Sequence, residues 1–478
     1  MCRMISRLLL LFLLVATLPT ARGFSLLGNF ASWQTTGIGY NSLNTDLGGP
    51  MGLGEQYRWV EPTIYYAFDQ SFLNYFGTKG ITAINAAMKI LNDLPPASAM
   101  SSNLTEFPLD TIRFNPTAAT LGILDIKSVA LEYLMEELGL AKPERFTWTL
   151  RSRTVRDFGG VSTTNYTIIN RNFDPVTLLP SAYVNSTLYT YSVFEFTQPD
   201  FADAVDFVSS ANTSIFQRLS VAGFGISGGG GTAGGSANSV ASLGSYYIGL
   251  TRDDAGGLRY LLKPSRYAVE TLPPNSTVVA NGTVNVGSGN VNLAWLPVGT
   301  IPGGGTGTGV GGPIVPVNTA LRGGKNKLRF VRANYDSLLG TAFLSQTNNY
   351  SDPYVSNSRL ITQTVRRVAN QPDILFTAED LGTFGNTGTP VYNVRTGNLI
   401  SNDGINGQTT QPGPGVIQGT IRIGFTTTLP FFLAGNAFIG IGSSGVWGYF
   451  DGSDTPPVVF PDSISLQDLE NLVLQGGN

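Results

Sequence analysis

The 478-residue chain contains no histidine, and its single cysteine is Cys2. The absence of imidazole excludes catalytic triads that rely on a histidine base. It also removes the side chain that ordinarily titrates between pH 5 and 8, so no built-in pH switch is expected. With one cysteine no intrachain disulfide can form, and stability must come from burial of a core.

Charge is also scarce. Charged residues make up 13% of the chain and the formal net charge is -3, against a usual charged fraction of about 25%. This balance gives no electrostatic case for binding nucleic acid or anionic membranes. The 58 glycines instead favour turn-rich β structure with a polar, weakly charged surface, a composition that goes with lateral association.

The N-terminus has the pattern of a secretory leader. Arg3 and Arg7 precede an apolar run over residues 8–16, and Ala21 and Gly23 are small residues at the two positions that a signal peptidase reads. The sequence predicts a signal peptide over residues 1–23 and a secreted, extracellular or cell-surface chain, periplasmic in a Gram-negative host. An uncleaved anchor is the alternative, but the run is shorter than the roughly 20 apolar residues of a membrane span, and none is expected in the mature chain.

Residue periodicity predicts a mixture of strands and helices. The expected strands include 63–68 and 110–114, and short strands are expected between 146 and 198. The expected helices span 81–91, 125–140, 202–219 and 253–262. The predicted fold class is α+β, with an α/β domain over 24–265 and a β-rich, sandwich-like domain over 266–478 that carries a glycine-rich loop at 303–312.

Several segments match the sequence pattern of a known site but lack the structural or chemical context that the site needs. Residues 307–312 fit G-x-G-x-x-G but lack a following helix. Residues 225–229 fit G-x-S-x-G, which needs a histidine base. The irregular 402–407 stretch does not suit a calcium loop. A basic run is interpreted as a solvated hairpin and comprises Arg322, Lys325, Lys327, Arg329 and Arg332. No metal or cofactor is expected.

The segment from Val129 to Leu140 has the sequence VALEYLMEELGL. It resembles the zinc helix of metzincin proteases of the matrixin type, whose pattern is H-E-x-x-H-x-x-G-x-x-H. In that family the histidines hold zinc and the glutamate activates the bound water. The resemblance places Glu132 and Glu136 at the first two histidine positions, Tyr133 at the glutamate position and Lys142 at the third histidine position.

Two more segments are similar to the same family. Residues 63–91 resemble its first strand and first helix, and residues 250–258 (LTRDDAGGL) resemble the segment that opens its closing helix. The interval between Phe114 and Val129 is too short for the family's middle strands, and no methionine follows Met135. The resemblance therefore implies a metzincin-like domain that has lost its zinc site. The alternative is an ordinary amphipathic helix whose solvated face contains Ser128, Glu132 and Glu136.

These observations favour a secreted, non-catalytic, pseudoprotease-like protein that binds an extracellular protein or carbohydrate, or self-associates in a surface layer. The competing hypothesis is a carboxylate-dependent hydrolase such as a glycoside hydrolase, in which Glu132 and Glu136 form the acid pair. A third hypothesis is a binding module in the β-rich half. Its candidate surface aromatics, which are equally candidates for the core, are Trp295, Tyr350, Tyr354 and Trp447.

Overall fold

The computed structural model describes most of the chain, and its described ranges are 22–40, 46–196, 202–210, 243–279, 283–286, 289–292, 317–335, 343–356, 358–384, 389–390, 393–401, 413–427 and 446–476. Predictions for the leader (residues 1–21), for the motifs at 225–229 and 307–312, and for the segments 303–312 and 402–407 lie outside these ranges, as does Trp295. The fold is mixed α/β with strands dominating, at 40% strand and 20% helix.

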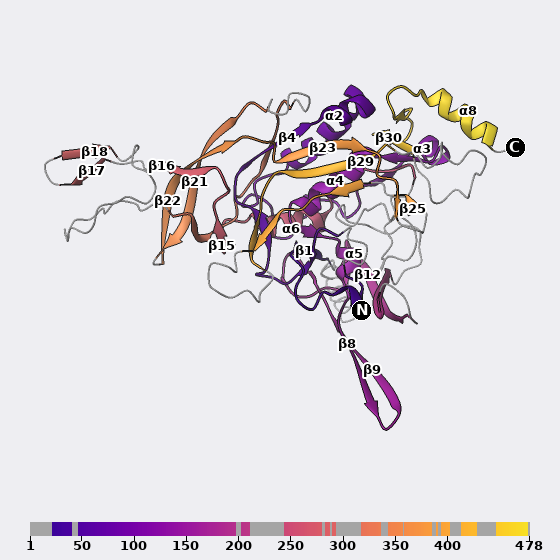
Figure 1. Ribbon diagram of the computed structural model, residues 1–478, viewed down its shortest axis with the longest axis horizontal. Coiled ribbons are helices and arrows are strands. Elements are labelled where there is room, and N and C mark those ends of the chain that lie inside the picture. Colours follow the sequence, from indigo (N-terminus) through magenta and orange to yellow (C-terminus); the bar gives the residue numbers. More distant parts are fainter. Residues whose placement is uncertain are drawn as a thin grey trace, which may run out of the picture.

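A five-stranded mixed sheet forms the centre of the molecule (Figure 1). Three of its neighbouring pairs are parallel, and the last strand is an antiparallel edge. In spatial order the strands are β20 (Arg329–Arg332), β4 (Thr63–Phe68), β23 (Ile374–Glu379), β29 (Ile421–Thr426) and β26 (Asn393–Arg395).

Helix α2 (Gln70–Asn92) follows β4 and packs on this sheet. The Asp69 side chain caps its N-terminus by accepting a hydrogen bond from the Phe72 amide. Its apolar positions recur at helical spacing, so one face of the helix is buried against the strands. Phe68 stacks on Phe376 with ring centroids 5.5 Å apart. The strand and helix expected over 63–91 are thus confirmed.

The central sheet joins segments that are distant in the sequence. Both neighbours of β4, which are β20 and β23, come from beyond residue 320. The expected boundary near residue 265 therefore does not separate two independent cores. The C-terminal half ends in helix α8 (Leu466–Gly476) and contributes three strands to the parallel pairs. Parallel pairing was not expected because it needs partners that local sequence patterns do not identify.

The remaining helices of the described ranges are short. They are η1 (Thr36–Ile38), α3 (Pro116–Thr120), α4 (Ile126–Glu137), α5 (Pro143–Phe146) and α6 (Arg252–Leu262). The helices expected over 125–140 and 253–262 are confirmed as α4 and α6. None of the helices in the described ranges combines the length and apolarity needed to cross a bilayer.

An antiparallel sheet from the β-rich half lies beside the central sheet (Figure 1). Its strands, in order, are β15 (Ala268–Thr271), β19 (Thr319–Arg322), β21 (Gln346–Ser356), β22 (Arg359–Ala369) and β16 (Ser276–Val279). The N-terminal sheet contains β10 (Asn172–Phe173), β1 (Phe24–Gly28), β2 (Gly49–Met51) and β7 (Leu140–Ala141).

Smaller sheets complete the fold. Those with three strands are β27 (Leu399–Ser401) with β28 (Gly415–Ile417) and β3 (Tyr57–Trp59), β31 (Val458–Val459) with β30 (Val446–Tyr449) and β6 (Ile123–Asp125), and β11 (Tyr183–Val184) with β12 (Thr187–Glu195) and β13 (Ala204–Ser210). The pairs are β14 (Ser245–Tyr247) with β5 (Ile112–Phe114), β17 (Thr283–Val286) with β18 (Gly289–Asn292), β24 (Thr383–Phe384) with β25 (Thr389–Pro390), and β8 (Thr149–Phe158) with β9 (Val161–Ile169).

The helix expected over residues 202–219 is wrong where the structure describes it. Residues 204–210 form strand β13, which pairs antiparallel with β12 along its whole length. The sequence there, AVDFVSS, contains two valines and a phenylalanine, which favour strands, and cross-strand pairing outweighs the weak helical spacing. The short strands expected between 146 and 198 are confirmed as β8 to β12.

Candidate functional site at helix α4

Helix α4 begins at a buried cap. The Asp125 carboxylate accepts hydrogen bonds from the Ser128 amide at 3.0 Å and from the Ser128 hydroxyl at 2.5 Å. The same hydroxyl oxygen accepts a hydrogen bond from the Tyr247 amide of β14 at 2.7 Å. Ser128 thus joins the first turn of the helix to a neighbouring strand.

All twelve residues of α4 are buried. The apolar stripe expected along the helix is confirmed, but the alternative of a solvated face is wrong. Glu132 has no exposed surface, and Glu136 is 7% exposed. Helix α2 and strands β7, β14 and β30 all pack against α4, so the polar side of the helix is covered by segments from distant parts of the chain.

The chain turns sharply where the helix ends. Gly139 has a φ of +98°, in the left-handed region that glycine tolerates. Its amide donates to the Glu136 carbonyl oxygen at 2.9 Å, and the chain then enters β7. This reversal carries Lys142 back to the helix. Lys142 Nζ lies 3.1 Å from Glu132 Oε1 and 3.7 Å from Glu136 Oε1.

A second cation reaches the helix from the central sheet. Arg395, at the end of β26, forms an ion pair with Glu136. Its guanidinium also lies over the Tyr133 ring, 4.5 Å from the centroid. The four positions singled out in the sequence, Glu132, Tyr133, Glu136 and Lys142, are therefore brought together in one cluster with Arg395.

No family model, curated protein or solved structure matches this chain.

Burial controls protonation in this cluster. Burial raises the pKa of Glu132, and the charges of Lys142 and Arg395 oppose the increase. Burial also raises the pKa of Tyr133 well above its usual range. Glu137 is 1% exposed, and burial alone raises the pKa of its carboxyl well above the usual value. Glu132 and Glu136 face two cations, Lys142 and Arg395.

Sequence reasoning missed one member of this cluster, Arg395, and also missed the burial of the neighbouring Glu137. Glu137 directly follows Glu136, so three acids in six helical residues were visible, and such a density on a helix that also carries Leu131 and Leu134 is itself a signal. No local pattern pointed to Arg395, because only the pairing of β26 with β29 brings it to α4. Among the described residues, no group of three or more potential metal ligands was found.

The segment 250–258 forms a second buried polar site at the start of α6. Thr251 and Asp254 make a reciprocal capping box. The Asp253 carboxylate is fully buried and accepts hydrogen bonds from the amides of Gly23 at 2.8 Å and Asn185 at 2.6 Å. Asp253 thereby connects the helix to the start of β1, which is a structural role.

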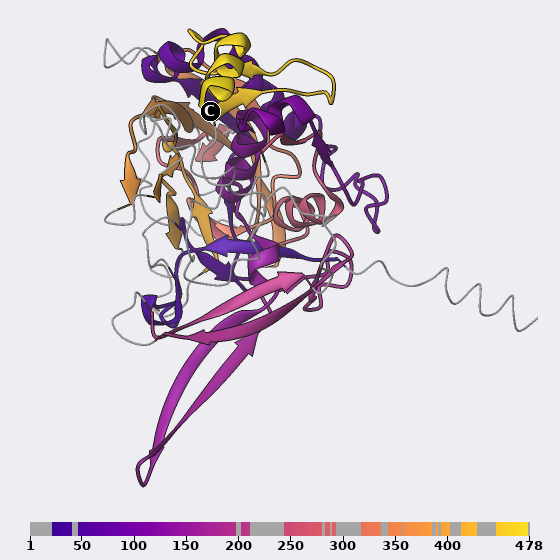
Figure 2. The same cartoon turned by 90° about the vertical axis from the view of Figure 1, so that its right-hand side faces the viewer.

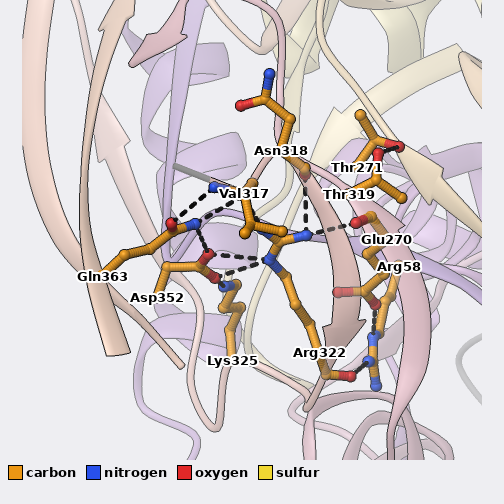
Figure 3. Close-up of polar contacts among 10 residues, drawn as sticks. All are labelled: Arg58, Glu270, Thr271, Val317, Asn318, Thr319, Arg322, Lys325, Asp352 and Gln363. Atoms are coloured by element: carbon orange, nitrogen blue, oxygen red, sulfur yellow. Dashed lines mark hydrogen bonds and ion pairs between the residues drawn. The ribbon is translucent and has the colours of Figure 1, made fainter. Parts of the chain in front are cut away.

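Part of the basic run belongs to a buried scaffold rather than to a solvated hairpin (Figure 3). Arg322 is 0% exposed, and its Nε lies 3.0 Å from both Asp352 oxygens. Lys325 Nζ also lies 3.0 Å from Asp352, and Arg58 pairs with Glu270. Lys327, Arg329 and Arg332 are exposed, as expected.

The candidate binding aromatics that the structure describes are core residues. Tyr350, Tyr354 and Trp447 are 8%, 2% and 1% exposed. Trp447 donates from its indole Nε1 to the Thr426 carbonyl oxygen at 3.0 Å. These three side chains therefore do not form a surface for carbohydrate.

Two buried carboxyl groups have pKa values raised into the range in which histidine ordinarily titrates. Burial raises the pKa of Glu61 to about 7, although Arg367 opposes the increase. Burial raises the pKa of Asp206 to about 6, and Arg145 opposes it. Burial thus raises the pKa of these carboxyl groups into the range in which histidine ordinarily titrates, and the expected absence of a pH switch stays a prediction.

Proposed function

We propose that this chain is a secreted, non-catalytic, pseudoprotease-like protein that acts by extracellular binding or as a self-associating surface component. The observation that carries the proposal is the convergence of Glu132, Glu136 and Lys142. The resemblance assigns these positions to three zinc ligands, and Lys142 Nζ lies within 3.7 Å of both carboxylates. A lysine ammonium group and the Arg395 guanidinium supply the positive charge that a metal supplies in the family.

The arrangement supports a structural role for the cluster. Glu132 has no exposed surface, and its carboxylate is neutralised by an ion pair rather than held ready for a substrate. The interval between residues 114 and 129 has no room for the family's middle strands, and β4 instead pairs in a sheet with β20, β23, β29 and β26 from the C-terminal half. In our proposal these strands take the place of the family's middle strands.

Restoring the ligands tests the geometric part of the proposal. A variant carrying Glu132→His, Glu136→His and Lys142→His, together with Arg395→Met to remove the competing cation, should bind zinc with three nitrogen ligands. Metal content is measured by elemental analysis after dialysis, with the wild-type chain as the control. A folded variant that retains no more zinc than the wild-type chain would contradict the resemblance.

An activity panel tests the non-catalytic part. The wild-type chain should release neither peptides from protein substrates nor sugars from polysaccharides, with or without added zinc. The competing function, a carboxylate-dependent hydrolase, is favoured by one observation: burial raises the pKa of Glu132, as a general acid requires. Turnover by the wild-type chain that is lost in a folded Glu132→Gln variant would establish the hydrolase and reject our proposal.

A further inference from the structure

The hairpin formed by β8 and β9 projects away from the rest of the molecule as a long arm (Figures 1 and 2). Its two strands pair from Thr149 and Ile169 at the base to Phe158 and Val161 at the tip, with one shift in register between Leu150 and Ser152. Gly159 and Gly160 form the turn, with φ values of +58° and +94°, as a two-residue hairpin turn requires.

The outer part of this arm is solvent-exposed, whereas its base is anchored. Phe158 and Val161, side by side at the tip, are 66% and 68% exposed. Near the middle, Arg153 forms a bidentate ion pair with Glu195 of β12, through Nε to Oε1 and Nη2 to Oε2. In the described part of the chain, β9 pairs with no strand other than β8. A two-stranded hairpin is marginally stable in water, and a third strand is the usual remedy.

The two edges of the arm differ in charge. Strand β8 contains three arginines and one aspartate, in the sequence TLRSRTVRDF. Strand β9, with the sequence VSTTNYTII, contains no charged residue and no proline. Charged side chains and proline are the devices that normally prevent an exposed edge from pairing with another chain. The β9 edge lacks both devices, so it is the open edge of the arm.

We propose that β9 pairs antiparallel with β9 of a second copy of this chain, so that two arms form a four-stranded sheet about a two-fold axis. This inference rests on the proposed self-associating function and names the surface through which it works. The self-pairing places no like charges opposite each other, since β9 is uncharged. Its threonine-rich sequence also suits cross-strand threonine pairs.

The symmetry also accounts for the apolar tip. With the axis near Asn165, Val161 of one copy lies opposite Ile169 of the other, so each tip reaches the level of the other arm's base. There Trp148 packs on Tyr191 with ring centroids 5.2 Å apart, and Tyr191 is 44% exposed. Two exposed apolar surfaces of the same chain are thereby brought to the same level.

Single cysteines test the pairing directly, because the only native cysteine is Cys2, within the predicted leader. Cysteine is placed in turn at Thr163, Thr164, Asn165 and Tyr166, and the secreted protein is oxidised mildly. The chain is made in a host that adds no N-linked glycan to the sequon at Asn165. At least one β9 variant should form a disulfide-linked dimer in good yield. Thr154→Cys is the matched control, since Thr154 lies opposite Asn165 in the hairpin but on the other edge.

Charge insertion tests the energetics by sedimentation over a concentration series. Asn165→Glu should weaken dimerisation at least 10-fold, because two carboxylates would meet near the axis, and Thr154→Glu should leave it unchanged. Equal effects of both variants, or cross-linking through Thr154 alone, would overturn the proposal. Assembly that is indifferent to β9 would also overturn it, while leaving a self-associating function intact.

A monomeric wild-type chain that binds phosphatidylserine vesicles through Phe158 would assign the arm to a lipid surface instead and overturn the pairing. Vesicle flotation of the wild-type chain and of Phe158→Ser distinguishes this outcome. Leu360→Ser, at a position that is 65% exposed on a different sheet, controls for general loss of surface hydrophobicity. The non-catalytic proposal is decided separately by the activity panel, so the two failures remain distinguishable.

Discussion

At the level of single residues, this protein is organised around buried carboxyl groups. Glu132, Glu137, Glu61 and Asp253 are each at most 1% exposed, and burial raises the pKa of all four. Buried charge is costly unless it is paired or neutralised. Each buried carboxyl group is therefore stabilised in one of two ways. Either a cation such as Lys142 or Arg367 pairs with it, or it becomes protonated.

Removing Lys142 should reveal the cost of an unpaired carboxylate. Lys142→Met leaves Glu132 buried with one fewer cation beside it. We expect the free energy of unfolding at pH 8 to fall by about 2 kcal/mol. This loss is smaller than for a fully buried ion pair because Lys142 is partly exposed. Since the variant raises the pKa of Glu132 further, the loss should shrink at pH 5. Urea unfolding at both pH values measures it.

The double variant Glu132→Gln/Lys142→Met is the control for this experiment. It removes the charge that needs a partner, so it should be more stable at pH 8 than Lys142→Met alone. If the single and double variants are equally destabilised, then packing of the lysine side chain, and not its charge, is what stabilises the site.

Glu61 should give the protein a pH-dependent stability. Its pKa is about 7 in the folded protein, against an ordinary value of 4.5, so the folded state holds a proton that the unfolded state releases. This contribution is present below pH 4.5 and is lost as the pH rises through 7. The shift corresponds to at most about 3 kcal/mol.

Glu61→Gln should flatten this dependence. Urea unfolding at pH 5, 6, 7 and 8 should show a smaller decline for the variant than for the wild-type chain. Some decline should remain, because Asp206, with a pKa raised to about 6, has the same sign. An unchanged slope in Glu61→Gln would show that Glu61 does not hold the extra proton.

At the level of secondary structure elements, α4 and the turn that follows it form the unit that assembles the cluster. The helix presents Glu132 and Glu136 one turn apart, and Gly139 reverses the chain so that Lys142 meets both. A Cβ at Gly139 would lie 2.3 Å from the Tyr57 carbonyl oxygen. Both the backbone conformation and the available space therefore require glycine.

Gly139→Ala should be strongly destabilising. The alanine would combine a left-handed backbone with a clash against the backbone of β3, and we expect a loss of about 3 kcal/mol in chemical denaturation. Gly54→Ala is the matched control, since Gly54 has a φ of +91° but, its chain neighbours aside, no atom would lie within 4 Å of a Cβ at that position. That control should lose only about 1 kcal/mol, and equal losses would mean that the close approach to Tyr57 is unimportant.

At the scale of the whole molecule, the two halves of the chain share one core. The main hydrophobic cluster runs from Phe24 to Phe460, and β4 has both of its neighbours in the C-terminal half. The scaffold around Arg322 and Arg58 adds a second connection, because Arg58 of β3 pairs with Glu270 of β15. Folding of the N-terminal half therefore depends on the C-terminal half.

A fragment containing residues 24–265 should not fold on its own. It would expose both edges of β4 and the face of Phe68 that stacks on Phe376, so we expect weak, non-cooperative thermal unfolding by circular dichroism. The longer chain, residues 24–478, measured in parallel, should unfold in one cooperative transition. A sharp transition in the fragment would restore the boundary near residue 265 as a true domain boundary.

The sequence by itself determined the local elements and the excluded chemistry. Helical spacing located α2, α4 and α6, β-branched residues located β4, and the missing histidines excluded imidazole catalysis, because each of these depends on neighbouring residues or on composition. Only the tertiary structure decided which strands pair and which side chains meet. The parallel pairing of β4 with β20 and β23, the burial of Glu132, and the meeting of Arg395 with Glu136 all join residues far apart in the chain. Side chains that look solvated in the sequence became buried because distant strands cover them, and no local pattern encodes that contact.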